Sequence, residues 1–137
     1  MIAVILCTHS TLAQGLLDSA EMIIGPQENV AVVPLMDGDS VDELQEKLRL
    51  VAASFRQKGL PYCYLVDLFG ASPFNACLMS EGSGGANVIA GVNLPFLLEL
   101  LIQRTGFGAE SIDSFLDEMI KSAGKLTRMN AEIASCL

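Results

Sequence analysis

The sequence has no tryptophan, a single histidine, and only eight lysine and arginine residues among its 137. Nucleic-acid binding depends on clustered basic side chains, and the few present here are dispersed, so we expect no nucleic-acid partner. No apolar run approaches the roughly 18 residues of a membrane-spanning helix. Sixteen acidic residues give a formal net charge of −8, which is typical of an acidic, water-soluble domain.

Metal-binding patterns are also missing. None of the four cysteines lies in a C-x-x-C pair, so we expect buried, reduced thiols. The cysteines are Cys7, Cys63, Cys77 and Cys136. A zinc site would need ligand spacing that one histidine and scattered cysteines do not provide. The stretch Asp37-Gly38-Asp39 is acidic, but the other ligands of a calcium loop are absent, and we interpret it as a polar turn. We predict no metal and no cofactor.

The length of the chain predicts one domain, residues 1–137, because single cores most often contain roughly 100–150 residues. Met1 is followed directly by an apolar segment with the pattern of a strand, without a secretory signal. We therefore expect a cytoplasmic protein.

Short apolar segments alternate with segments of helical periodicity. The predicted strands are Ile2–Cys7, Val30–Pro34, Pro61–Val66 and Asn87–Val92. The predicted helices are Thr11–Ile24, Ser40–Lys58, Ser72–Glu81, Pro95–Ile102 and one that begins after Ser111. This alternation predicts an α/β fold, a three-layer sandwich with a mainly parallel, doubly wound sheet.

Several details of the helices follow from local patterns. Ser40 and Glu43 form a capping-box signature, and Ser72 before Pro73 fits an N-cap followed by the first helical position. The first and last helices carry apolar stripes that we expect to face the core. These are Leu12, Leu16, Leu17, Ala20, Ile23 and Ile24, and then Ile112, Phe115, Leu116, Met119 and Ile120. The tail from Leu126 to Leu137 either extends the last helix or is separated from it at Gly124.

The only histidine follows the first predicted strand, and Asp67 follows the third. In open α/β sheets ligands bind at the carboxyl ends of the strands, so we expect His9 and Asp67 to lie together. A histidine acts as a nucleophile through one ring nitrogen when an acceptor holds the N–H of the other. Asp67 can be that acceptor, which makes His9 and Asp67 the candidate catalytic pair. The competing interpretation is an unreactive loop histidine beside a turn aspartate.

The stretch Gly70-Ala71-Ser72-Pro73 precedes the third helix. Small residues at a helix N-terminus allow backbone N–H groups to approach an anion, although the same stretch fits ordinary capping. The hydroxyls of Thr8, Ser10 and Ser72 offer further donors. A nucleophilic imidazole beside an anion site predicts a phosphoryl group carried on His9. Nucleotide hydrolysis would instead require a P-loop or carboxylates for magnesium.

These residues, together with others in chain order, resemble the IIA domain of the mannose-family sugar phosphotransferase system. The resemblance covers roughly Met1 to Arg104 and is weaker beyond it. The motifs that carry it are Thr8-His9, Ala20-Glu21-Met22, Gly25-x-x-Glu28-Asn29-Val30, Val66-Asp67, Gly70-x-Ser72-Pro73-Phe74-Asn75 and Val88-Ile89-Ala90-Gly91-Val92-Asn93-x-Pro95.

The resemblance implies that His9 accepts a phosphoryl group from phospho-HPr and passes it to a histidine of a IIB component. That component feeds a membrane permease that phosphorylates sugar during uptake, so membrane association would be indirect. Asp67 would match the aspartate paired with the histidine, and Ser72 with its neighbours Gly70 and Ala71 would match the phosphoryl-binding loop. The resemblance also implies a homodimer in which a C-terminal strand is exchanged.

The sequence departs from the family pattern at two loop positions. Ala71 replaces the usual second glycine, so we expect a slightly altered anion site, and Phe69 replaces a frequent tryptophan. No IIB domain follows, which predicts a free-standing IIA protein. Two alternatives stay open: the phosphotransfer subunit of dihydroxyacetone kinase, and a non-catalytic regulatory binding module on the same fold.

Overall fold

The computed structural model describes residues 1–82, 85–123 and 126. Strands and helices alternate along the chain, as predicted. The strands are β1 (Ala3–Cys7), β2 (Val30–Val32), β3 (Tyr62–Val66) and β4 (Val88–Ala90). The helices are α1 (Leu12–Ile24), α2 (Val41–Gln57), α3 (Ser72–Ser80), α4 (Leu94–Gln103) and α5 (Ile112–Ser122), with a 3₁₀ turn η2 (Arg104–Gly106) after α4.

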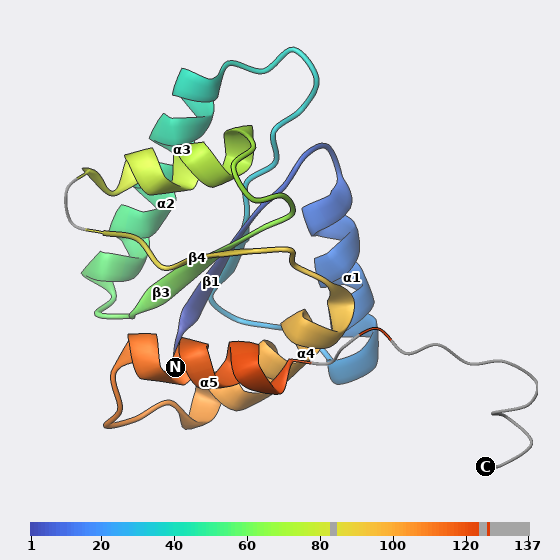
Figure 1. Cartoon of the computed structure of the whole chain (residues 1–137), viewed down its shortest axis with the longest axis vertical. Coiled ribbons are helices and arrows are strands. Elements are labelled where there is room, and N and C mark those ends of the chain that lie inside the picture. Colours follow the sequence, from blue (N-terminus) through green and yellow to red (C-terminus); the bar gives the residue numbers. More distant parts are fainter. Residues whose placement is uncertain (83–84, 124–125, 127–137) are drawn as a thin grey trace, which may run out of the picture.

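The four strands form one parallel sheet in the order β2-β1-β3-β4 (Figure 1). Val4 of β1 is paired with Val30 of β2 on one side and Cys63 of β3 on the other. The chain adds strands first to one side of β1 and then to the other, so the direction of winding changes between β1 and β3. In open α/β sheets ligands bind at such a change, so we expect a site at the carboxyl ends of these two strands.

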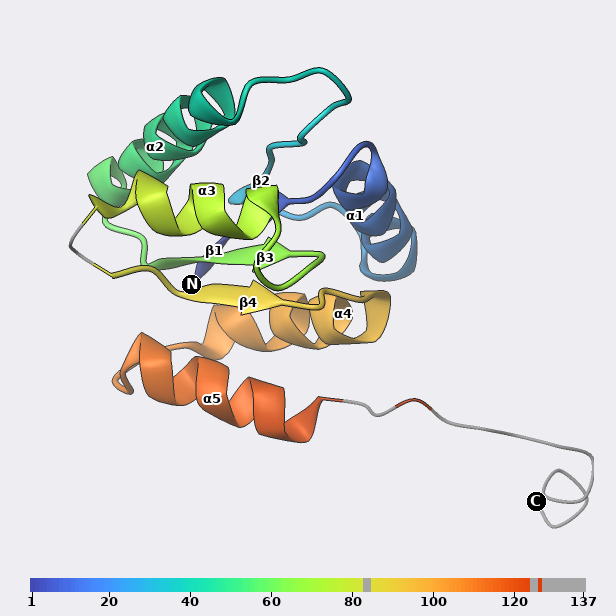
Figure 2. The same cartoon turned by 45° about the horizontal axis from the view of Figure 1, so that its top comes forward.

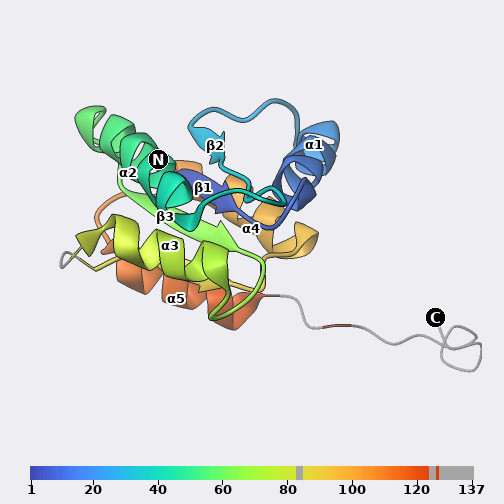
Figure 3. The ribbon, with the colours of Figure 1, turned by 90° about the horizontal axis from the view of Figure 1, so that it is seen from above.

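Helices cover both faces of the sheet (Figure 2). α2 and α3 pack on the face of Ala3, Ile5 and Cys7, whereas α1, α4 and α5 pack on the face of Ile2, Val4 and Leu6. Seen from above, α1 lies on one side of β1, and α2 and α3 lie on the other (Figure 3). All residues of β1 are buried because both of its faces are covered. The predicted three-layer, doubly wound α/β fold is confirmed.

The predicted apolar stripes of the outer helices are wider than the surface that the helices bury. Leu17 and Ala20 of α1 are buried, but Leu12 and Ile23 are 47% and 60% exposed. Ile120 of α5 is 49% exposed, so the prediction that it faces the core is wrong. A helix at the edge of a small sheet contacts it along a narrow stripe, and apolar residues beside that stripe stay in contact with solvent.

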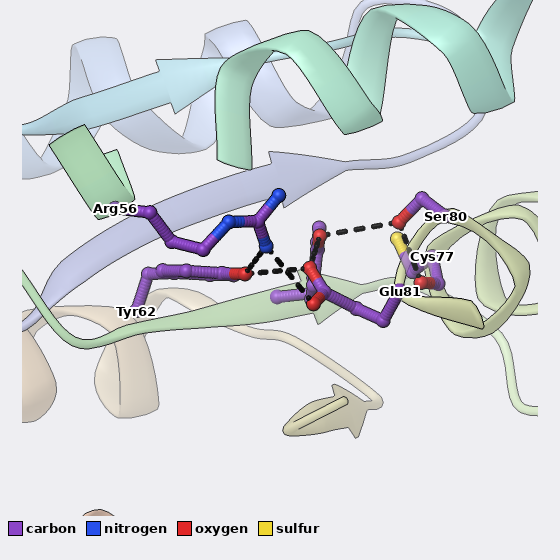
Figure 4. Close-up of polar contacts among 6 residues, drawn as sticks. Arg56, Tyr62, Cys77, Ser80 and Glu81 are labelled. Carbon is purple, nitrogen blue, oxygen red and sulfur yellow. Dashed lines mark hydrogen bonds and ion pairs between the residues drawn. The ribbon is translucent and has the colours of Figure 1, made fainter. Parts of the chain in front are cut away.

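Two polar networks lie at the amino ends of the strands. On the α2–α3 face, the Glu81 carboxylate accepts hydrogen bonds from Tyr62 at 2.7 Å and Tyr64 at 2.5 Å, and Arg56 approaches it at 3.2 Å (Figure 4). Burial and the Glu81 carboxylate raise the pKa of Tyr62 to about 12. The network connects α2 and β3 to the end of α3.

On the opposite face, the side chain of Arg104 is 1% exposed. Its guanidinium donates hydrogen bonds to the carbonyl oxygens of Ile2 at 3.1 Å, Glu28 at 2.6 Å and Asn29 at 3.3 Å. These carbonyls precede β1 and β2, so Arg104 joins the end of α4 to the start of the sheet. Its Nε is the one buried side-chain nitrogen or oxygen without a partner within the described ranges.

The remaining expectations on cysteines and on the tail have mixed outcomes. Cys7, Cys63 and Cys77 are buried free thiols, as predicted. Cys136 and the tail from Leu126 to Leu137, apart from Leu126 itself, lie outside the described residues, so the exchanged C-terminal strand stays a prediction. No helix found in residues 1–82 and 85–123 combines the length and the apolar character that a membrane crossing requires.

Candidate functional site

His9 lies just beyond β1, on a backbone held by the segment that follows β2. Leu35 donates its N–H to the Thr8 carbonyl at 2.9 Å, and Ser10 donates to the Leu35 carbonyl at 2.8 Å. His9 itself forms an isolated parallel bridge with Leu35. Ser10 then adopts φ = 52°, a conformation uncommon for a non-glycine residue, and the chain turns into α1. The backbone that carries His9 is therefore held in place by hydrogen bonds on both sides of the histidine.

The Asp67 carboxylate holds both the ring and the backbone of His9. Its Oδ2 lies 2.8 Å from His9 Nδ1 and accepts the His9 backbone N–H at 3.1 Å. Its Oδ1 accepts the N–H of Leu68 at 3.0 Å. A carboxylate only accepts, so Nδ1 carries the proton and Nε2 of the neutral ring keeps its lone pair. The His9 side chain is 45% exposed and that of Asp67 is 12% exposed.

Asp67 is held in its charged form. Partial burial alone would raise the pKa of its carboxyl, but the hydrogen bonds from the His9 ring and the backbone outweigh burial and hold the pKa below its ordinary value. At neutral pH the site therefore contains a carboxylate that stabilises positive charge on the imidazole.

The loop before α3 differs from the prediction in its cap. The N-cap is Ala71, with no side-chain cap hydrogen bond, and Ser72 and Pro73 begin the helix. Because Ser72 is inside the helix, its hydroxyl is not used as a cap. The left-handed conformation belongs to Gly70, at φ = 76°, whereas Ala71 is extended at φ = −79°. The loop thus needs no glycine at position 71, and the expected disturbance by the Ala71 methyl group has no basis in backbone conformation.

His9 and Ser72 line a hollow of about 370 Å³ at this edge of the sheet. Its other lining residues are Ser10, Leu35, Met36, Asp37, Gly38, Asp39 and Val41. Among the predicted phosphoryl-binding residues, Ser10 and Ser72 therefore lie with His9 at the hollow. In the described part of the chain, the amide N–H groups of Gly70 and Ser72 have no hydrogen-bond acceptor.

Thr8 takes a different place. It is fully buried, and its hydroxyl accepts the N–H of Ala13 at 2.8 Å and points to the His9 carbonyl at 3.4 Å. Its hydroxyl is therefore occupied in joining the end of β1 to the first turn of α1. Gly70 and Ala71 are not among the lining residues of the hollow.

Apolar side chains around the site were not predicted from the sequence. Met36 is 40% exposed, and Leu68 and Phe69, which follow Asp67 in the chain, are 59% and 82% exposed. Phe69 packs on Phe74 with ring centroids 4.8 Å apart. The sequence feature that could have indicated them is the presence of large apolar residues in loops that otherwise have the composition of turns. Within residues 1–82, 85–123 and 126, no three acidic, histidine or cysteine residues cluster as metal ligands would.

Comparisons with known proteins show the family of this chain. The family model described as "PTS system fructose IIA component" matches residues 3–122. The mannose-specific EIIAB component of Escherichia coli K12 is 37% identical over 124 residues, which are 89% of this chain and 36% of that protein. The chain thus spans about a third of that relative's length.

Relatives of similar length are also found. The fructose-specific EIIA component of Bacillus subtilis is 36% identical over 106 residues, which cover 76% of this chain and 71% of that protein. The crystal structure of an EIIA component from Streptococcus agalactiae superposes with a TM-score of 0.76 at 32% identity, covering 89% of this chain and 92% of that one. The match over residues 3–122, the shared fold and these relatives show that the chain belongs to the mannose-type EIIA family of phosphotransferase-system components.

Proposed function

We propose that this protein is a phosphohistidine carrier that accepts a phosphoryl group on His9 from phospho-HPr and passes it to a IIB component. The observation that carries the proposal is the 2.8 Å contact between His9 Nδ1 and Asp67 Oδ2, which leaves the opposite ring nitrogen free to attack. Membership of the EIIA family supports the same conclusion.

In the first step the lone pair of His9 Nε2 attacks the phosphorus of the donor in line. A new N–P bond forms, the N–P bond to the donor histidine breaks, and its electron pair returns to the donor ring. No proton needs to be added, because Nδ1 keeps its proton and Asp67 stabilises the charge that develops on the ring. Positioning and electrostatics account for most of such a transfer.

The transferred group would lie beside Ser10 and Ser72, with the free N–H group of Ser72 as a further donor at the start of α3. Gly70 and Ala71 as phosphoryl ligands stay predictions. We infer that Thr8 supports the His9 backbone from the protein interior, because its buried hydroxyl holds the turn that carries His9. No metal or cofactor takes part in this proposal.

The test is intact mass after incubation with phosphoenolpyruvate, Enzyme I and HPr, for the wild type and His9→Ala. A phosphate-sized gain in the wild type alone, lost in mild acid, is the expected result. No gain in either protein would overturn the proposal and favour a regulatory binding module. A gain in both would mean that another residue carries the group.

In the second step a IIB histidine attacks the phosphoryl group on His9, and a membrane permease then uses it for sugar uptake. This scheme places the protein in the cytoplasm. The acceptor separates it from the phosphotransfer subunit of dihydroxyacetone kinase: phosphate should leave His9 on addition of a IIB component. Transfer to the acceptor subunit of dihydroxyacetone kinase instead would reassign the protein.

We also propose a homodimer. Within the described residues β4 pairs only with β3, and hollows along its outer edge are lined by Ile89 of β4 and Ile120 of α5. An unpaired edge strand beside apolar side chains favours association. The mass in solution, measured by light scattering for the wild type and Ile120→Glu, tests this. We expect two copies for the wild type and weaker association for the variant; a wild-type monomer would contradict the proposal.

A further inference from the structure

Asn75 stands out among the polar residues near the site because its side chain faces back toward the loop rather than the hollow. Its Nδ2 donates a 3.0 Å hydrogen bond to the carbonyl oxygen of Gly70, and its backbone N–H donates to the Ala71 carbonyl, also at 3.0 Å. The side chain of Asn75 is exposed. Its contribution therefore comes from this hydrogen bond and not from burial.

The hydrogen bond acts at Gly70, the residue of the loop with the greatest backbone freedom. Gly70 is at φ = 76° and has no side chain to restrain it, so glycine alone leaves this peptide free to rotate. Because a peptide unit is planar, fixing the Gly70 oxygen fixes the plane of the Gly70–Ala71 peptide. The orientation of that peptide plane determines the direction in which the chain continues through Ala71 to Ser72.

Ser72, the first residue of α3, lines the hollow that it shares with His9. Its N–H and hydroxyl have no partner in the described part of the protein, so they are available to a ligand. We propose that Asn75 is a positioning residue: through the Gly70 carbonyl it holds Ser72 in the orientation that receives the phosphoryl group on His9. This inference rests on the proposed carrier function.

The structure also offers a matched control. Gln45 donates its side-chain amide to the carbonyl of Met79 at 3.4 Å, at the other end of the same helix, and is half-buried. Replacing Gln45 removes a hydrogen bond of the same chemical type, from a side-chain amide to a backbone carbonyl of α3, without touching the loop. Asn75→Asp is the near-isosteric variant, because a carboxylate of the same shape cannot donate to the Gly70 oxygen.

The experiment measures the rate of phosphoryl transfer from phospho-HPr as a function of its concentration. We expect Asn75→Ala and Asn75→Asp to lower the maximal rate roughly tenfold with little change in the concentration for half-maximal rate, because partly lost orientation slows the chemical step more than docking. The contact of Phe69 with Phe74 also restrains the loop, which limits the loss. Gln45→Ala should remain within about twofold of the wild type.

A spectroscopic measurement separates this role from general destabilisation. The NMR chemical shift of the Ser72 amide should change when the wild type is phosphorylated. In Asn75→Ala this change should be smaller, while the melting temperature stays the same. Full activity of Asn75→Ala beside an active wild type would overturn this inference alone, as would an unchanged Ser72 shift. A wild type that takes up no phosphate would overturn the proposed function and this inference together.

Discussion

The two ends of the sheet differ in whether their polar groups have hydrogen-bond partners within the chain. At the amino ends of the strands, Arg104 and Glu81 are surrounded by partners from the same chain. At the carboxyl ends, His9 is 45% exposed, and the amides of Gly70 and Ser72 find no acceptor in the described residues. Internal hydrogen bonds stabilise a fold, whereas groups left without partners are available to a ligand. The comparison assigns stability to one end and chemistry to the other.

The largest expected effect is at the carboxyl end. Asp67→Asn should lower phosphoryl transfer to His9 by on the order of 10²–10³-fold, because the amide no longer stabilises a positive ring or fixes its tautomer. The rate of uptake from phospho-HPr measures this. Asp18→Asn, an exposed carboxyl change on α1, is the control and should transfer at the wild-type rate. An active Asp67→Asn would mean that the two ends are not divided as proposed.

At the amino end, Arg104→Met should act on stability and leave transfer intact. The methionine fills part of the space but leaves the carbonyls of Ile2, Glu28 and Asn29 without their donor, which lowers the free energy of unfolding by about 3 kcal/mol. Urea unfolding gives the value. Arg49→Met, which removes an exposed pair with Glu46, should leave the midpoint unchanged. A loss of transfer without a loss of stability in Arg104→Met would contradict the comparison.

A smaller stability effect is expected for Glu81→Gln. The amide keeps the shape but loses the charge that Tyr62, Tyr64 and Arg56 share, so we expect a loss of about 1–2 kcal/mol. The pKa of Tyr62, raised to about 12 by burial and by Glu81, should fall when the carboxylate is removed. Ultraviolet absorbance against pH measures this tyrosine ionisation, since the protein has two tyrosines and no tryptophan. An unchanged titration would show that Glu81 does not act on Tyr62.

The smallest expected effect is the pH dependence of stability that Asp67 contributes at the carboxyl end. The pKa of Asp67 in the folded protein lies below its ordinary value, which in an unfolded chain is about 3.9. The stability that follows is fully present above the unfolded value and is lost as the pH falls through the folded value. Denaturant midpoints between pH 6 and 3 should therefore fall less in Asp67→Asn than in the wild type. Parallel curves would show that the carboxylate contributes nothing to stability.

Which of these features were predictable depends on how local they are. The strand ends at His9 and Asp67 follow from apolar runs that stop abruptly, and alternation of strands and helices brings both to one edge. The cap of α3 was misassigned to Ser72 because Ser before Pro fits a cap locally, while the loop from Gly70 places Ala71 there. Leu35 and Val41 were missed as lining residues because ordinary apolar positions carry no chemical signature.

By itself, the sequence determined the α/β class, the order of the elements and the residues with the chemistry for phosphoryl transfer, because periodicity, chain breaks and side-chain type are local properties. Only the tertiary structure decided which hydroxyls face His9 and which are buried beneath it, as Ser72 and Thr8 show. It also decided the partners of Arg104, which are separated from it by 75 to 102 residues. Contacts at such separations depend on how layers pack, and no local pattern specifies that packing.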